Sequence, residues 1–419
     1  MLALQAMIAL SDGRVAVNAP TDPPRPAALE GMRIIDFSHV YQGPVGTQLL
    51  ADFGADVIKV ERPGSGDWSR AWGPYVGDVS LPFATLNRNK RSVTLDLHTP
   101  QAREIALRLI ATADVLVHNF RPGVMERLGL GYEQLAERYP RLVYAYSSGW
   151  GDEGPCVERG RGGHDMLARA SAGWFAPLGP DGLPVPAGIS ADYPAGLLLM
   201  HAVLIALLAR ERTGRGQLVS TDLLSAAFHA NSWEGGADLN RERAVPGGIV
   251  QTEAIIDKSF RTLDGFIEIS PVFSPDALKD ISLAMGLGDL SEDARFATVE
   301  DRTANARELN AILAARFREK PTAEWVAILE PQGVLCGEIK TFAQAAEDPQ
   351  VRANRMVIAM EHPSAGTLRL LGTPIRLRDT PATHRLPPPE LGQHTEEVLA
   401  EIGYSQEEIA ALRAQGALG

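Results

Sequence analysis

The chain has 419 residues, a formal net charge of −12, 45% hydrophobic and 22% charged residues. This length exceeds one ordinary core, so we expect two domains, and the composition is that of a folded globular protein. An acidic chain binds nucleic acid poorly, so no nucleic-acid partner is expected. The two cysteines, Cys156 and Cys336, are too few for a disulfide framework and lack metal-ligand spacing. We therefore expect a reduced, cytoplasmic setting and no metal.

The first 30 residues lack the features of a secretion signal. The opening MLALQAMIAL is apolar, but it has no basic segment and no A-x-A-like cleavage site. Residues 1–30 are therefore predicted to form a flexible leader, with the fold beginning at Gly31. The most hydrophobic stretch, residues 194–209, is shorter than the roughly 20 residues that a bilayer requires, and it runs into a basic turn. We predict a buried helix there and no membrane partner.

From residue 32 onward, short apolar runs alternate with helical patterns. Strands are predicted at residues 32–38, 57–61, 92–97, 114–120 and 142–148. Helices are predicted at residues 43–55 and 100–112, the second with Thr99 as its N-cap. This alternation indicates an α/β fold with a parallel, helix-covered sheet. Ligands of such sheets lie beyond the carboxyl ends of the strands, which points to the loops after Phe37, Glu61, Leu97 and Phe120.

The pattern changes after about residue 230. A hairpin is predicted around residues 263–265, followed by helical segments at 306–320 and 322–330. We interpret residues 240–345 as a second, smaller domain. The final helical pair, at residues 394–404 and 405–416, lies in a return segment. Residues 350–419 are therefore expected to complete a large domain that begins with residues 31–225.

Cationic side chains follow the predicted strand ends. Arg62, Arg70, Arg121 and Arg127 lie in or just after these loops, and NRNKRS at residues 87–92 adds three more cations. The planar guanidinium group donates two parallel hydrogen bonds to an oxyanion, which suits phosphate. In an acidic protein this favours a phosphorylated ligand, although each cation alone could be a solvated surface group. Neither the dinucleotide-binding motif nor the P-loop motif occurs.

Several blocks of the sequence resemble the class III CoA-transferases. They are GMRIIDFSHV, LLADFGADVIKVERPGSGD, NRNKRSVTLDL, ADVLVHNFRPGVMERLGL, YSSGWGDEGP, ERTGRGQLV and LGQHTEEVLAEIG. This superfamily includes formyl-CoA and carnitine CoA-transferases and the α-methylacyl-CoA racemases, and the resemblance runs from about Gly31 to the C-terminus. It implies a Rossmann-like large domain with a parallel sheet, a smaller α+β domain and an intertwined, ring-like homodimer.

The resemblance also implies residue roles. The catalytic aspartate of the family matches Asp192 in ISADYPAG, and the loop residues His39 and Asp165 are expected to contact substrate. Coenzyme A contacts are implied at Val40, Tyr41, Gln42, Arg62, Leu95, His98, Asn119, Phe120, Arg121 and Arg127. His98 and Gly162 stand where formyl-CoA transferase has lysines, so this chain differs at two of the expected phosphate contacts.

The expected chemistry is transfer of CoA from an acyl-CoA thioester to a free carboxylic acid. Asp192 would attack the thioester and form an aspartyl intermediate that accepts and then releases CoA. Because Asp192 precedes a long helix, it could occupy the N-cap, which would lower its pKa and keep it ionised. Capping the helix is also the simplest purely structural role for this residue.

Two other functions remain open at the level of sequence. The racemases of the superfamily have a histidine at the position of His164, paired with the aspartate that matches Asp192. Those two residues would face each other across the α-carbon of the thioester and exchange its proton through an enolate. A CoA-binding protein without turnover is the remaining alternative.

Overall fold

The computed structural model describes residues 26–176, 183–186, 188–243, 255–256, 258–270 and 276–419. The chain divides into two compact units. The larger comprises residues Met1–Ser232 and Arg355–Gly419, and the smaller comprises Trp233–Asn354. The first division falls between residues 225 and 240, where the sequence suggested a change, and the second lies a few residues beyond 350. Most of the predicted leader, residues 1–25, lies outside the described residues.

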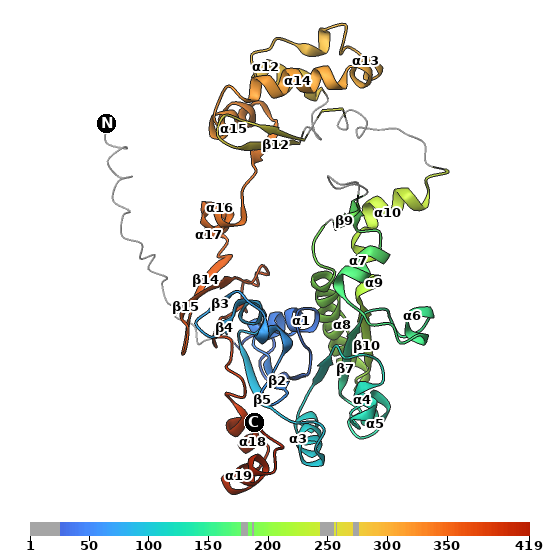
Figure 1. The fold of residues 1–419 in the computed structure, drawn as a ribbon, viewed down its shortest axis with the longest axis vertical. Helices are drawn as coiled ribbons and strands as arrows, with labels where there is room; N and C mark the ends of the chain where they lie inside the picture. Colours follow the sequence, from blue (N-terminus) through green and yellow to red (C-terminus); the bar gives the residue numbers. More distant parts are fainter. Residues whose placement is uncertain (1–25, 177–182, 187, 244–254, 257, 271–275) are drawn as a thin grey trace, which may run out of the picture. The chain divides into compact units, whose positions relative to one another are not determined.

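A six-stranded parallel sheet forms the centre of the larger unit (Figure 1). Its order is β10-β7-β6-β1-β2-β5. The strands are β1 (Arg33–Asp36), β2 (Asp56–Glu61), β5 (Lys90–Thr94), β6 (Val115–His118), β7 (Val143–Ser148) and β10 (Leu218–Asp222). In register, Ile35 of β1 lies opposite Ile58 of β2 and Leu116 of β6. The predicted α/β fold with a parallel sheet is confirmed.

Helices cover both faces of this sheet because its strands carry apolar side chains on both sides. Ile34, Val57 and Val115 pack against α1 (Gln42–Asp52) and α8 (Asp192–Thr213). The alternate residues, such as Ile35 and Ile58, pack against the other layer. That layer is made by α3 (Pro100–Ala111), α18 (Thr395–Glu401) and α19 (Gln406–Ala414). The C-terminal segment therefore completes the core of the larger unit, and the side-chain hydroxyl of Thr395 accepts a hydrogen bond from the backbone of Thr94.

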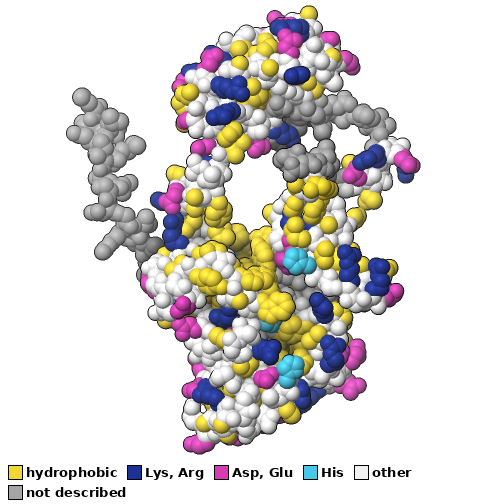
Figure 2. Space-filling view, viewed as in Figure 1, with side chains coloured by type: hydrophobic (Ala, Val, Ile, Leu, Met, Phe, Trp, Pro, Cys, Tyr) yellow, Lys and Arg dark blue, Asp and Glu magenta, His cyan; other side chains and the backbone are white. Residues whose placement is uncertain are grey.

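Helix α8 differs from its prediction as a buried helix. Leu199, Met200 and Val203 are buried against the sheet, but Ile205 and Leu208 are 67% and 61% exposed. Among the described residues, α8 is the one helix long and apolar enough to cross a membrane, a criterion that core helices of soluble proteins also meet. Figure 2 shows further hydrophobic side chains gathered over the middle of this unit, with charged side chains mainly toward its edges.

The remaining elements of the larger unit are short. Two described hairpins are β3 (Tyr75–Val76) with β4 (Val79–Ser80), and β14 (Val357–His362) with β15 (Gly366–Leu371). β8 (Phe175–Ala176) pairs with β9 (Val185–Pro186). The other helices are η1 (Trp68–Ala71), α2 (Leu81–Leu86), α4 (Val124–Arg127), α5 (Tyr132–Ala136), α6 (Pro155–Glu158), α7 (Asp165–Ser171) and α9 (Leu223–Ala230).

The smaller unit is an α+β fold with its own core. Its antiparallel sheet has the order β11 (Ser259–Arg261), β12 (Phe266–Ser270) and β13 (Leu335–Glu338). Phe260, Phe317 and Trp325 are buried together at its centre. Its helices are α12 (Ala277–Ala284), η2 (Leu290–Glu292), α13 (Val299–Ala304), α14 (Ala306–Phe317), α15 (Thr322–Leu329), η3 (Glu330–Gln332), α16 (Phe342–Glu347) and α17 (Pro349–Ala353). Helix α10 (Ser232–Leu239) begins at the division between the units.

Ordered structure begins before Gly31. The backbone N–H of Leu29 donates to the carbonyl of Phe53, and the Leu29 side chain packs against the core beneath α1. Residues 26–30 therefore belong to the fold, and not to a flexible leader.

Candidate active site

The sheet has a switch point between β1 and β6, where the strand order reverses direction. Asn119 fixes the two loops that leave this point, because its side-chain amide spans from one loop to the other. Its Oδ1 accepts the backbone N–H of His39, and its Nδ2 donates to the carbonyl of His39, each at 2.8 Å. Since ligands of parallel sheets bind beyond such a switch point, the loops predicted from sequence lie where a ligand is expected.

Buried ion pairs support the first loop from below. Lys59 and Asp67 form a 2.9 Å ion pair with both side chains fully buried, and Lys59 also donates to the carbonyl of Ser38. Asp67 in turn accepts the backbone N–H of Val40, a residue with a left-handed φ of 69°. A β-branched residue rarely adopts that conformation, so these contacts offset its strain.

A second buried pair lies beside the first. Asp36 and Lys90 are 3.1 Å apart, and Asp36 also accepts from the hydroxyl of Thr47. Burial alone would raise the pKa of Asp36, but the ammonium groups of Lys90 and Lys59 bring that pKa down to about 2. Asp36 is therefore ionised throughout the neutral range.

Several cations proposed from sequence are used within the fold. Arg70 forms an ion pair with Glu61 and lies over the ring of Phe83, 3.6 Å from its centroid. In the NRNKRS segment, Arg88 pairs with Asp52, Lys90 with Asp36 and Arg91 with Asp56. These four side chains stabilise the sheet and the first loop, so they are not available to bind phosphate.

A cavity of about 500 Å³ opens beyond the carboxyl ends of β1, β2 and β5. Six of the predicted coenzyme and substrate contacts line it: His39, Arg62, Leu95, His98, Phe120 and Arg127. Arg103 and Trp68 line it too and were not predicted. Three arginines line it, and none of them has a carboxylate partner among the residues that the structure describes: Arg62, Arg103 and Arg127. The cavity therefore presents three guanidinium groups that are not engaged in ion pairs among the described residues, although the carboxylates of Glu61 and Asp96 also line it.

His39 is largely buried in this cavity, between an aromatic ring and the buried Asp67 carboxylate, which lies 4.0 Å from its Nδ1. Its ring lies 5.6 Å from that of Phe120, and its Nδ1 is buried without a hydrogen-bond partner among the described residues. Burial lowers the pKa of His39, and Lys59 lowers it further, while Asp67 opposes this effect. The imidazole is therefore neutral at physiological pH.

Other predicted contacts lie outside the lining of this cavity. The Gln42 amide is buried and donates to the Ser147 hydroxyl and the carbonyl of Ser148, so its nitrogen is used inside the fold. Arg121 is exposed, and one guanidinium nitrogen lies 3.0 Å from where a Cβ on Gly162 would be. The absence of a side chain at Gly162 therefore leaves room for the Arg121 guanidinium.

The candidate catalytic carboxylate is on the first turn of α8. Asp192 is the first residue of the helix, Ala191 is the N-cap, and no side chain caps this end. Burial raises the pKa of Asp192 to about 6, and the nearby Asp165 carboxylate adds to that rise. The predicted N-cap role and the lowered pKa are therefore both wrong. A charge on Asp192 is disfavoured by its surroundings and is not stabilised by a cap.

Asp165 supports the segment that precedes Asp192. It is the first residue of α7, and its Oδ1 accepts from the Ser190 hydroxyl at 2.9 Å and from the backbone N–H of Ala191 at 2.5 Å. Its other oxygen faces Arg169 at 3.4 Å. Asp165 thus anchors the N-terminus of α8 to that of α7 and places two carboxylates in one site.

The first loop reaches the same site because α1 and α8 pack closely. A Cβ on Gly196 would lie 2.3 Å from the carbonyl oxygen of Gln42, so only glycine permits this approach. Burial raises the pKa of Tyr41, and the nearby Tyr193 and Asp192 add to it. The Tyr41 hydroxyl therefore stays protonated at neutral pH and lies near the Asp192 carboxylate.

His164 is the N-cap of α7 and is exposed. Its Nδ1 accepts the backbone N–H of Met166 at 3.2 Å. The neutral ring therefore carries its proton on Nε2 and offers a hydrogen-bond donor on that side. To act as a base through Nε2, the His164 ring would have to carry its proton on Nδ1. It could then no longer accept the Met166 N–H, and the helix cap would be lost.

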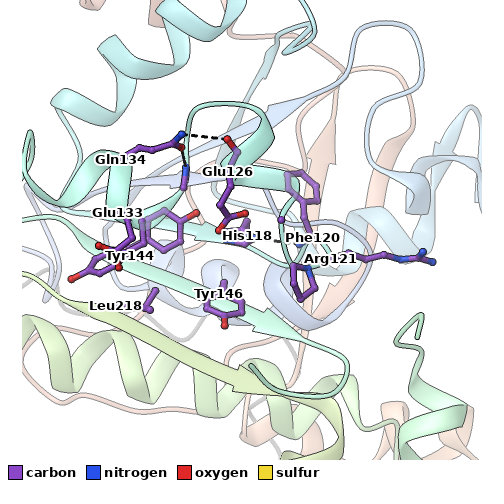
Figure 3. A pocket seen from close by; sticks show the side chains of 13 residues that line it. His118, Phe120, Arg121, Glu126, Glu133, Gln134, Tyr144, Tyr146 and Leu218 are labelled. Carbon is purple, nitrogen blue, oxygen red and sulfur yellow. Dashed lines mark hydrogen bonds between the residues drawn. The ribbon is translucent and has the colours of Figure 1, made fainter. Parts of the chain in front are cut away.

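A second cavity of about 220 Å³ shares Phe120 with the first as a lining residue (Figure 3). Aromatic rings form part of its wall: the ring of His118 stacks on Tyr146 and meets the edge of Tyr144. Burial lowers the pKa of His118 to about 3, so the ring is neutral. Arg121 lines this cavity, but its guanidinium points away from the aromatic residues in Figure 3.

No group of three or more potential metal ligands occurs among the described residues. The candidate functional groups are those of the cationic cavity at the switch point, and the pair of carboxylates at the first turns of α7 and α8.

Comparison with known proteins identifies the family. Residues 29–395 match the model of CoA-transferase family III. The chain belongs to this family. It is an enzyme of the CoA-transferase class, and acyl-CoA thioesters are the substrates of that class.

Family III relatives share most of the length of the chain. The succinyl-CoA:glutarate CoA-transferase of Mus musculus is 36% identical over 400 residues, which cover 93% of this chain and 90% of the relative. The acetyl-CoA:oxalate CoA-transferase of Acetobacter aceti is 36% identical over 88% of this chain and 94% of the relative. A solved CAIB/BAIF family protein from Brucella suis has a TM-score of 0.80 at 32% identity, covering 90% of this chain and all of that one.

Proposed function

We propose that this family III enzyme moves CoA from an acyl-CoA thioester to a free carboxylic acid through a covalent intermediate on Asp192. The observation that carries the proposal is a half-buried carboxylate with a pKa of about 6 at the start of α8. The cavity at the switch point adds arginines that have no carboxylate partner among the described residues. Such a carboxylate is largely ionised at neutral pH but weakly solvated, which favours its reaction as a nucleophile.

The proposed reaction has four steps. An Asp192 oxygen attacks the thioester carbonyl and the C–S bond breaks, which gives an acyl-aspartyl anhydride and CoA thiolate. The thiolate attacks the aspartyl carbonyl and releases the donor acid as its carboxylate, leaving a CoA thioester on Asp192. The acceptor carboxylate attacks this thioester and expels the thiolate again. The thiolate then attacks the acceptor's carbonyl, which forms the product thioester and regenerates the Asp192 carboxylate.

Each of these steps places negative charge on a former carbonyl oxygen. The Tyr41 hydroxyl is near Asp192 and remains protonated, because burial and the neighbouring carboxylates raise its pKa. We assign it as a donor to this oxygen. A donor directed at the developing charge contributes more to the rate than one that binds the substrate equally well.

The CoA moiety is assigned to the 500 Å³ cavity. Its phosphates would meet Arg62, Arg103 and Arg127, which have no carboxylate partner among the described residues. His98 lies at the same rim. These groups supply the local positive charge that an acidic protein needs to bind an anionic coenzyme.

Racemisation is the weaker assignment. It requires His164 to accept a proton, but its Nδ1 already accepts the Met166 N–H and its Nε2 then carries hydrogen. The relatives described above are named as transferases between carboxylic acids, including glutarate and oxalate. We therefore propose a small dicarboxylic acid as the acceptor.

The exposed apolar face of α8 supports a second proposal, that the enzyme is a homodimer. Leu204, Ile205 and Leu208 project from this helix and are at least partly exposed in the single chain. A second copy that covers them would remove this apolar surface from water. An intertwined arrangement is the form that the family resemblance implies.

The assay that tests this function supplies succinyl-CoA or acetyl-CoA together with glutarate, oxalate or no acid, in D₂O. A transferase forms the new thioester only when an acid is present, and it leaves the α-hydrogen of the donor in place. Mass spectrometry reads both results. Deuterium entering the α-position at the turnover rate without any acid would replace this assignment with racemisation.

A further inference from the structure

The hydroxyl of Ser190 joins the two carboxylates of the site. Its oxygen lies 2.9 Å from Oδ1 of Asp165 and 3.3 Å from Oδ2 of Asp192. The same oxygen accepts the backbone N–H of Asp192 at 3.2 Å. Ser190 is partly buried and precedes the N-cap of α8, so its side chain lies between the first turns of two helices.

A hydroxyl has one proton, so Ser190 can donate to only one of these carboxylates at a time. The shorter distance favours Asp165 in the resting structure. Asp165 takes part in no covalent step of the proposed reaction, whereas Asp192 alternates between a carboxylate and a neutral anhydride or thioester. A charged oxygen accepts a hydrogen bond more strongly than a neutral one.

We propose that Ser190 is a positioning residue whose hydroxyl proton alternates between Asp165 and Asp192 while Asp192 is a free carboxylate, and stays with Asp165 while Asp192 is acylated. The inference rests on the proposed function, since it requires a covalent cycle at Asp192. No bond other than a hydrogen bond changes. The hydroxyl stabilises the Asp192 carboxylate when it leaves at the last step, and it satisfies Asp165 in the intermediates.

The neighbours of Asp192 act on it in opposite directions, which makes the inference testable. Burial and then Asp165 raise the pKa of Asp192 to about 6, and the Ser190 hydroxyl works against that rise. Removing the hydroxyl should therefore move the acid limb of the pH–rate profile to higher pH. Removing the charge of Asp165 should move the same limb to lower pH.

The experiment measures single-turnover labelling of Asp192 by acyl-CoA, trapped with hydroxylamine, as a function of pH. Ser190→Ala should raise the apparent pKa of the acid limb by about half a unit or more, Ser190→Thr should restore it, and Asp165→Asn should lower it. Ser220→Ala is the matched control, because the Ser220 hydroxyl bonds the carboxylate of Asp152 at 2.9 Å outside this site. It should leave the limb in place.

The controls separate this inference from the proposed function. CoA affinity within about twofold of wild type shows that the Ser190 variants keep an intact site; if Ser190→Ala does not fold, Ser190→Gly removes the same hydroxyl and its pH profile decides. Asp192 labelled in Ser190→Ala with the wild-type pH profile would overturn the inference and leave the proposed function standing. No label on Asp192 in the wild-type enzyme would instead remove the proposed function.

Discussion

At the scale of single residues, Asp192 combines two properties that oppose each other. Its burial and the adjacent Asp165 raise its pKa to about 6, so the fold stabilises the ionised form less than water does, although that form predominates at neutral pH. The proposed chemistry needs the ionised form. Enzymes commonly carry such an electrostatic cost at a reacting group, because a charge that function needs but the fold disfavours lowers the free energy of unfolding.

Asp192→Asn should make the protein more stable at neutral pH. The folded pKa lies above the unfolded value of 3.8, so the folded state loses stability as the pH rises from about 4 through 6. Above that range the cost is at most about 3 kcal/mol, from 1.4 kcal/mol per unit of pKa. Thermal unfolding should show a clear gain for the variant at pH 7.5 and little gain near pH 4. An equal gain at both pH values would contradict the raised pKa.

Arg127→Ala should weaken CoA binding by about 1.5–3 kcal/mol, the range for a lost charge-assisted hydrogen bond. Arg127 lines the 500 Å³ cavity and has no carboxylate partner among the described residues, so its charge is available to a phosphate. Arg108→Ala is the control, because Arg108 is exposed on α3 and pairs with Glu104. Calorimetric titration with CoA measures both. Equal affinity in the two variants would remove Arg127 from the binding site.

At the scale of elements, the sequence predicted the five strands that carry dense apolar runs. β10 was missed because LVSTD has only two apolar residues and pairs with a single neighbour, β7. The residues of the site were harder to predict from the sequence. The partners of Arg88, Lys90 and Arg91 come from α1, β1 and β2, and spacing along the chain cannot show which cations find such partners.

The same limit explains the two errors at α8. Its apolar run predicted a helix, but an apolar composition does not tell which face the rest of the fold covers. An acidic residue at a helix start predicts a cap. Here Ala191 takes that position and the Asp165 carboxylate accepts its N–H, so Asp192 lies within the first turn.

The close contact of α1 and α8 gives a prediction for the whole element pair. Gly196→Ala should destabilise the protein by about 1–3 kcal/mol or more, because its Cβ would lie 2.2 Å from a methyl group of Val45 and meet the Gln42 carbonyl. Gly236→Ala in α10 is the control, since nothing lies within 4 Å of that Cβ. Denaturant unfolding compares them. Equal midpoints would show that α1 and α8 can separate at no cost.

At the scale of the whole molecule, the proposed intertwined homodimer has a direct consequence. Two interlocked chains cannot separate without unfolding, so dissociation and unfolding should occur together. Sedimentation during denaturant titration should show dimer and unfolded chain only. Ile205→Arg, on the exposed face of α8, should lower the concentration of denaturant at which both transitions occur. A folded monomer at micromolar concentration would contradict this topology.

The central claim is that Asp192 becomes covalently modified during transfer. The enzyme is mixed with an acyl-CoA, quenched with hydroxylamine and digested, and the peptide that contains ISADYPAG is analysed by mass spectrometry. The account predicts a hydroxamate on Asp192 that requires acyl-CoA and that is absent from the Asp192→Asn variant. An enzyme that transfers CoA at full rate with Asp192 unmodified and another residue labelled would contradict it.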